Sequence, residues 1–151
     1  MDKFSQIDEK TFRGSRPLGP DDLFALQKRG IKTIISLEEG WGTFFGHWSK
    51  ESQVWEGLGG YWLQVKLSSV VPPTAGQVYA IYSLIKVYQA HGNVFFHCYS
   101  GVDRTGVVAA DYRVVEQGWT PERAWQEAIA EGMHWRYQRT WKPAFLRAFA
   151  K

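Results

Sequence analysis

The chain has 151 residues, a length that suits one domain with a proper hydrophobic core. Its 18 basic and 15 acidic residues leave a net charge of only +3, which excludes the broad basic footprint of a nucleic-acid-binding protein. The single cysteine excludes an internal disulfide, and the four scattered histidines lack the spacing of a zinc site.

No stretch has the length and apolarity of a membrane span, and the first residues lack the apolar centre of a signal peptide. We therefore expect a soluble, cytoplasmic monomer, unless an export signal has been trimmed from this chain.

The first half of the chain predicts strands and helices in alternation. Pro20 begins the first helix, because proline suits an initial helical position, and Gly30 ends it. In chain order we expect an edge hairpin at residues 4–7 and 11–13, this helix at 20–30 and a buried β-branched strand at 31–37. We then expect a glycine-punctuated loop at 38–46, a short helix at 49–56 and a second strand at 61–67.

The second half continues the alternation after a loop at residues 68–73. Thr74 and Gln77 have the spacing of a capping box and open a long helix that ends at Gly92. We then expect a strand at residues 94–97 that ends at His97, and two helices at 107–117 and 120–132. A polar-aromatic loop at 133–139 and a last helix from about residue 140 follow. This order predicts one α/β domain over residues 1–151, with a short, largely parallel sheet flanked by helices.

The segment His97-Cys98-Tyr99-Ser100-Gly101-Val102-Asp103-Arg104-Thr105-Gly106 joins an apolar strand to an apolar helix. A helix N-terminus presents unpaired N–H groups that bind anions and favour a thiolate there. Five residues between Cys98 and Arg104 are enough to wrap backbone amides around a tetrahedral oxyanion. Arg104 can close that ring with a bidentate guanidinium. The pattern predicts a nucleophile for phosphoryl transfer.

This segment resembles the loop of the cysteine-dependent phosphatases, H-C-x-x-G-x-x-R-[ST]-G, at every fixed position. The resemblance implies the family fold over nearly the whole chain, with Cys98 as nucleophile and Thr105 assisting departure of its sulfur. It also implies phosphate ligands at Tyr99, Ser100, Gly101, Val102, Asp103 and Arg104. Rhodanese-like sulfurtransferases are the nearer rival, but their loop resembles C-x4-R and is one residue shorter.

Two weaker similarities refine this interpretation. Residues 12–17 and 31–39 resemble the opening of small bacterial and plant dual-specificity-type enzymes, and the loop at 40–46 is similar to that of tyrosine-phosphatase-like inositol phosphatases (phytases). The loop that grips phosphotyrosine in the protein-tyrosine-specific branch has no counterpart here.

One departure concerns the general acid, an aspartate that the family usually carries on the loop at 68–73. No acidic residue occurs from Gly57 to Val102. Asp103 is our first candidate, as in some lipid-phosphatase relatives, and its alternative role is to accept hydrogen bonds from backbone amides. Glu38 and Glu39 are second candidates, with a solvated loop charge as the alternative for each.

Basic residues near the predicted cleft would engage further phosphates, although each alone is more often a solvated charge. They are Arg13, Arg16, Lys50, Lys66, Arg136, Arg139 and Lys142. Gln138 loosely matches a family glutamine that positions water.

We therefore predict a phosphomonoesterase that works through a phosphocysteine, without metal or other cofactor, on a small phosphorylated substrate, favouring soluble inositol polyphosphates. A protein tyrosine or dual-specificity phosphatase is the enzymatic alternative. A phosphate-binding pseudophosphatase is the alternative from another class.

Overall fold

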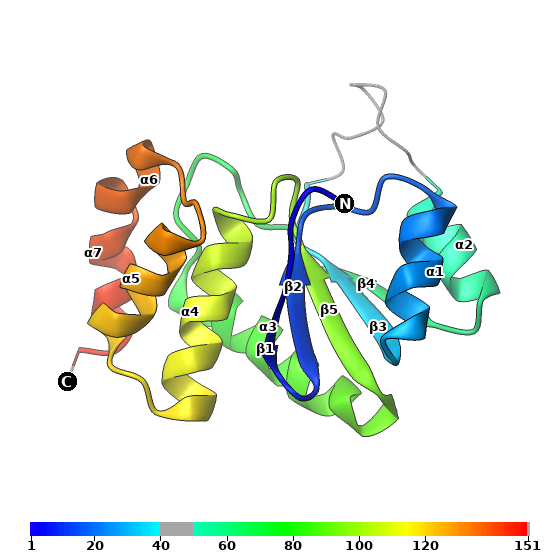
Figure 1. Cartoon of the computed structure of the whole chain (residues 1–151). Coiled ribbons are helices and arrows are strands. Elements are labelled where there is room, and N and C mark those ends of the chain that lie inside the picture. Colours follow the sequence, from blue (N-terminus) through cyan, green and yellow to red (C-terminus); the bar gives the residue numbers. More distant parts are fainter. Residues whose placement is uncertain (40–49, 151) are drawn as a thin grey trace.

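The computed structural model describes residues 1–39 and 50–150. Its sheet contains β1 (Phe4–Asp8), β2 (Thr11–Gly14), β5 (Asn93–His97), β3 (Ile31–Ser36) and β4 (Tyr61–Gln64), in that spatial order (Figure 1). The β1–β2 hairpin is antiparallel, whereas β2, β5, β3 and β4 run parallel to their neighbours. The expected α/β class and largely parallel sheet are confirmed.

The register of the parallel strands brings their carboxyl ends to one level. Gly14 of β2 and Ser36 of β3 both lie opposite His97 at the end of the central strand β5. The chain that leaves each strand therefore emerges at the same edge, where open parallel sheets bind their ligands.

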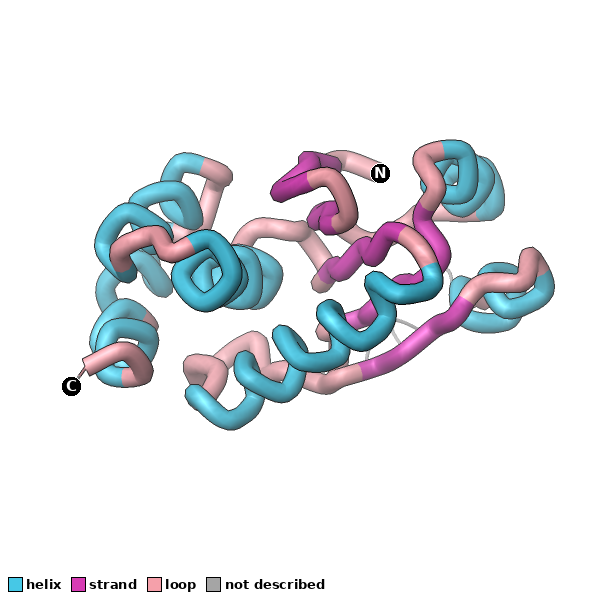
Figure 2. Tube along the Cα trace, turned by 90° about the horizontal axis from the view of Figure 1, so that it is seen from below, coloured by secondary structure: helices cyan, strands magenta, loops and turns pink. Residues whose placement is uncertain are grey.

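Each face of the sheet is covered by its own helices, because successive side chains of a strand point to opposite faces. Phe95 packs toward α1 (Pro20–Lys28) and α2 (Glu51–Gly57), beside Trp55. Phe96 packs toward the larger cluster on the opposite face. Both phenylalanines are fully buried. Figures 1 and 2 show α1 and α2 together on one side of the molecule.

The second face is covered by α3 (Ala75–Tyr88), α4 (Arg104–Gln117), α5 (Pro121–Ala130) and α7 (Lys142–Arg147), whose apolar side chains form one cluster with the sheet. α3 ends in the short 3-10 helix η2 (Gln89–His91).

The predicted capping box at the start of α3 is confirmed. The Gln77 amide donates to Thr74 Oγ1 at 3.1 Å, and the Thr74 amide donates to Gln77 Oε1 at 2.9 Å.

The structure corrects three boundaries. The loop expected at 133–139 is mostly helical, since it contains α6 (Trp135–Thr140), which His134 caps. The sequence did not predict this helix because six residues are too few to show an apolar stripe. The cysteine-proximal helix begins at Arg104 rather than 107, and β4 ends at Gln64 rather than 67. Of the glycine-punctuated loop predicted after β3, residues 40–46 lie outside the described residues.

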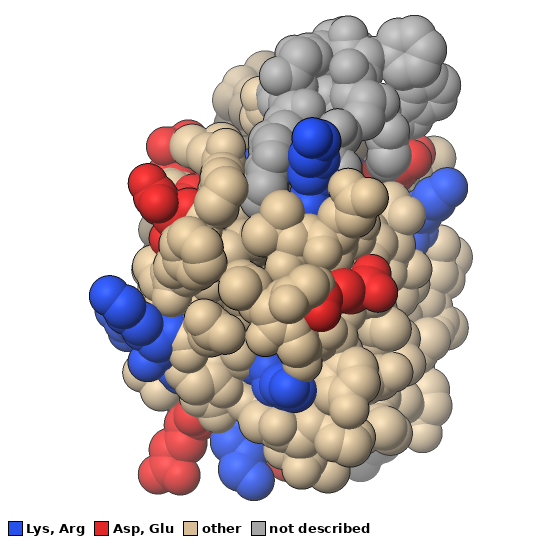
Figure 3. Space-filling model, turned by 90° about the vertical axis from the view of Figure 1, so that its right-hand side faces the viewer, with Lys and Arg blue, Asp and Glu red and all other residues tan. Residues whose placement is uncertain are grey.

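The charged side chains on the α1–α2 side are spread singly and do not gather into one basic patch (Figure 3). No helix in residues 1–39 and 50–150 is long and apolar enough to cross a bilayer.

Candidate active site

The predicted catalytic loop connects the central strand to α4 at the edge where the parallel strands end (Figure 1). Cys98 follows β5 directly and is 1% exposed. Arg104, at the other end of the loop, is the first residue of α4 and is 9% exposed. The fold therefore places the two ends of the motif as the sequence predicts, with the thiol and the guanidinium both largely shielded from solvent.

Hydrogen bonds hold the first two carbonyl groups of the loop. The His97 Nδ1 atom lies 3.0 Å from the Cys98 carbonyl oxygen. Because a carbonyl oxygen can only accept, Nδ1 is the donor of this hydrogen bond. The Arg16 amide donates to the Tyr99 carbonyl at 3.2 Å. In a trans peptide the next N–H points opposite to the carbonyl, so the N–H groups of Tyr99 and Ser100 are turned away from these donors.

A third carbonyl is held by a buried side chain. Arg13 Nη2 donates to the Gly101 carbonyl at 3.1 Å, which turns the Val102 N–H to the opposite side. Within the described residues, the N–H groups of Ser100, Gly101, Val102 and Asp103 have no protein acceptor. Unpaired backbone donors gathered in one loop form a site for an anion.

Gly101 is required by this arrangement for two reasons. Its φ of +78° lies in the left-handed region that side chains rarely adopt. A Cβ atom there would lie 2.5 Å from both the carbonyl carbon of Gly14 and the amide nitrogen of Ser15. The loop can therefore rest on the end of β2 only with glycine at this position.

Arg104 and Thr105 retain hydrogen-bonding capacity for a ligand. Arg104 Nη1 donates to the Leu67 carbonyl at 3.3 Å, which fixes the guanidinium and leaves its other donors available. Thr105 is fully buried, and its Oγ1 has no partner among the described residues. An unpaired buried hydroxyl is costly, so this one fits a functional role of the kind implied for Thr105.

The surroundings of His97 beneath the loop favour its charged form, because both ring nitrogens face acceptors. Its Nε2 atom lies 2.7 Å from Glu51 Oε2, and its Nδ1 atom faces the Cys98 carbonyl. Burial lowers the pKa of His97, but the charge and hydrogen bond of Glu51, with the charge of Glu38, outweigh burial and raise it.

Glu51 is the matching anion. Burial raises its pKa, but the charge and hydrogen bond of His97 and the Trp62 Nε1 donor at 2.8 Å lower it overall. This pair joins α2 to the strand that carries the cysteine.

The three candidate acids all lie around the loop, each with a partner. Asp103 Oδ1 accepts the His134 amide at 2.8 Å, so the alternative role as a backbone acceptor holds for one of its oxygens. Glu38 forms an ion pair with Arg16. Glu39 accepts from the Ser69 amide at 3.1 Å. Asp103 is the candidate inside the loop itself.

The predicted substrate contacts divide into engaged and exposed groups. Gln138 Nε2 donates to the Met133 carbonyl, and Lys142 pairs with Glu122. Arg13 and Arg16 support the loop and do not reach outward. Lys66, Arg136 and Arg139 are exposed.

The segment after β4 also meets α6 beside the loop, because the Tyr137 hydroxyl donates to the Ser69 carbonyl at 2.6 Å. Sequence reasoning missed Glu51, Ser69 and Tyr137, since no motif marks them.

The His97–Glu51 pair predicts a pH-dependent stability. The raised pKa of His97 gives stability that is complete below 6.5, its ordinary value, and is lost as the pH rises. The lowered pKa of Glu51 gives stability that is complete above 4.5 and is lost as the pH falls. Glu51→Gln should therefore lower the free energy of unfolding by roughly 1.5–3 kcal/mol, most strongly between these two values.

Urea denaturation at several pH values measures this difference. Glu122→Gln is the matched control, because Glu122 pairs with Lys142 at the surface and should change stability by less than about 1 kcal/mol. A loss in Glu51→Gln that does not vary with pH would contradict a charged His97.

Comparison with known proteins places the chain in a family. Residues 9–118 match the family model described as Tc-R-P, polymorphic toxin system, DSP-PTPase phosphatase. The dual specificity protein phosphatase TpbA of Pseudomonas aeruginosa (strain UCBPP-PA14) is 37% identical over 108 residues, which are 68% of this chain. The matched region spans only 42% of that relative.

Solved structures share the fold. The crystal structure of P. aeruginosa TpbA has a TM-score of 0.76 at 22% identity and covers 98% of this chain and 84% of its own. PTPMT1 in complex with PI(5)P has a TM-score of 0.75 at 22% identity, covering 98% and 97%. Because the family model spans well over half of the sequence, the chain belongs to the DSP-PTPase phosphatase family of polymorphic toxin systems, within the cysteine-dependent phosphatases.

Proposed function

We propose that the chain is a cysteine-dependent phosphomonoesterase that acts through a phosphocysteine. The observation that carries this proposal is the loop itself, in which outside donors hold three carbonyls and leave the amides and Arg104 to bind an oxyanion. Preorganised donors of this kind stabilise the charge that develops on the equatorial oxygens of a transferring phosphoryl group.

The reaction has two steps. The Cys98 thiolate attacks phosphorus, an S–P bond forms, and the P–O bond to the leaving group breaks. Water then attacks the phosphocysteine, which releases inorganic phosphate and restores the thiolate. Thr105 would stabilise the departing sulfur with its unpaired buried hydroxyl.

Asp103 is the proposed general acid. It would protonate the leaving oxygen in the first step and take a proton from water in the second. Since Oδ1 accepts the His134 amide, Oδ2 would carry the proton. Glu38 is less suited to this role, because its side chain is already engaged in an ion pair with Arg16.

The nucleophile is tested by alkylation and substitution. Iodoacetate should inactivate the enzyme by alkylating Cys98, and vanadate should protect it by occupying the same loop. Cys98→Ser should abolish hydrolysis and still bind vanadate. Phosphate release by Cys98→Ser at the wild-type rate would refute the assignment. Binding without turnover by the wild-type chain would support the pseudophosphatase alternative.

The acid is tested by comparing leaving groups. Asp103→Asn should slow hydrolysis of alkyl phosphates far more than that of aryl phosphates, because a poor leaving group depends most on protonation. Steady-state kcat on one substrate of each kind gives the comparison. Equal losses on both would assign Asp103 a structural role, and the same pair of assays would then be applied to Glu39→Gln.

We favour phosphotyrosine in proteins as the substrate, the alternative of our sequence analysis. Apolar side chains on three segments that meet at the loop support it, since Tyr99, Val70 and Trp135 are 50%, 77% and 75% exposed. Aromatic side chains pack well against a phenyl ring. The similar TpbA is named a dual specificity protein phosphatase, and its structure has been solved with pTyr.

Inositol polyphosphate, which the sequence favoured, is the second candidate. The exposed cations Lys66, Arg136 and Arg139 favour it, because each would add a charge-assisted contact to a further phosphate. Arg13 and Arg16, which our sequence analysis also assigned to such contacts, are already engaged within the protein.

Ionic strength separates the two substrates. Contacts with a polyanion weaken as salt is added, whereas packing against an aryl group does so much less. We expect phosphate release from phosphotyrosine peptides with a KM that changes little between two ionic strengths. A salt-sensitive KM for inositol polyphosphates, with peptides left intact, would move the assignment to the second candidate. Arg136→Gln should then raise that KM and leave peptide hydrolysis unchanged.

A further inference from the structure

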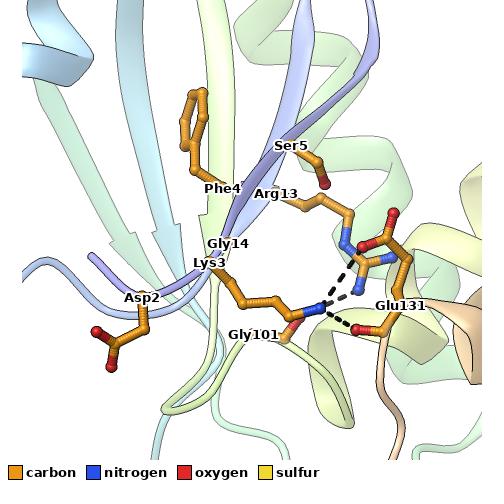
Figure 4. A pocket seen from close by; sticks show the side chains of 8 residues that line it. All are labelled: Asp2, Lys3, Phe4, Ser5, Arg13, Gly14, Gly101 and Glu131. Atoms are coloured by element: carbon orange, nitrogen blue, oxygen red, sulfur yellow. Dashed lines mark hydrogen bonds and ion pairs between the residues drawn. The ribbon is translucent and has the colours of Figure 1, made fainter.

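Arg13 lies behind the catalytic loop, on the side opposite to the unpaired amides. It belongs to β2 and is 3% exposed. Its side chain extends toward α5 and the loop, beside a cavity of about 240 Å³ that Lys3, Gly101 and Glu131 also line (Figure 4). The two chemical steps proposed for Cys98 use neither this cavity nor a contact between Arg13 and the substrate.

The hydrogen bond from Arg13 to the Gly101 carbonyl fixes one peptide of the loop. The Gly101–Val102 peptide is planar, so a carbonyl that points at Arg13 requires a Val102 N–H that points away from it. Gly101 has unusual conformational freedom, and without this bond the peptide could rotate. A rotated peptide would present a carbonyl oxygen to the bound anion, which would repel it.

Arg13 also keeps its positive charge for the loop. Burial lowers its pKa, while the charges of Glu131, Glu127 and Cys98 raise it and that of Arg113 lowers it. An arginine stays protonated under such opposing influences. Glu131 pairs with Lys3, and Glu127 pairs with Arg113, so each acid is shared with another cation. The guanidinium itself donates to the loop.

We propose that Arg13 is a positioning residue of the phosphatase site: it turns the Val102 amide toward the bound phosphoryl group. This inference rests on the proposed function. It assigns part of the anion affinity of the loop to a side chain that does not touch the substrate.

Two substitutions test this role. Arg13→Met removes both the hydrogen bond and the charge, whereas Arg13→Lys keeps the charge and loses the planar fork. Arg113→Met is the matched control, because Arg113 is another largely buried arginine. Among the described residues, it donates to the Ile7 carbonyl and the Glu127 carboxylate and makes no hydrogen bond to the catalytic loop. The readouts are the dissociation constant of vanadate, the shift of the ¹⁵N-resolved Val102 amide signal on adding vanadate, and the unfolding temperature.

Arg13→Met should weaken vanadate binding about tenfold or more and reduce the Val102 shift, since the donor that holds the Gly101 carbonyl is lost. Arg13→Lys should weaken vanadate binding less, because its ammonium keeps a donor for that carbonyl. Arg113→Met should lower the unfolding temperature and leave both other readouts unchanged.

Arg13→Met with the wild-type vanadate affinity and the wild-type Val102 shift would overturn the inference. If this variant does not fold, the wild-type protein decides: the ¹⁵N-resolved amide signal of Val102 should shift on adding vanadate, and an unmoved signal overturns the inference. The proposed function fails separately, if the wild-type chain neither binds vanadate nor releases phosphate.

Discussion

The candidate active site depends on hydrogen bonds accepted by the catalytic loop's own carbonyl groups. A loop of free peptides would turn some carbonyl oxygens toward a bound phosphate, where they repel it. Here His97, Arg16 and Arg13 each donate to one carbonyl of the loop, at 3.0, 3.2 and 3.1 Å. Because each peptide is planar, fixing its carbonyl also fixes the direction of the next N–H, and the site is formed before substrate arrives.

These donors are available because the sheet is parallel and in register. Gly14 and His97 lie side by side at the ends of β2 and β5, so the residues around the end of β2 support the loop that leaves β5. The support also brings positive charge beneath the thiol. The carboxylate of Glu51 balances part of that charge at His97 and attaches α2 to the central strand.

The general acid is the part of the site where this chain departs most from its family's usual pattern. The segment after β4 carries no carboxylate. It contributes the Leu67 carbonyl, which accepts from Arg104, and Ser69, which hydrogen-bonds to Glu39 and Tyr137. The carboxylate nearest in sequence to the arginine is Asp103, which also ties the loop to the start of α6 through the His134 amide. One residue would therefore combine proton transfer with the placement of a neighbouring segment.

The sequence by itself determined the α/β order, the hairpin, the capping box of α3 and the loop from Cys98 to Arg104, because spacing, β-branching and caps are local signals. Only the tertiary structure decided that Glu51 neutralises His97, 46 residues away, and that Arg13 holds Gly101, 88 residues away. It also turned the expected loop before the last helix into α6. Contacts between distant segments leave no periodic pattern, and surface and buried arginines look alike in sequence, so the burial of Arg13 and Arg16 could be learned only from the fold.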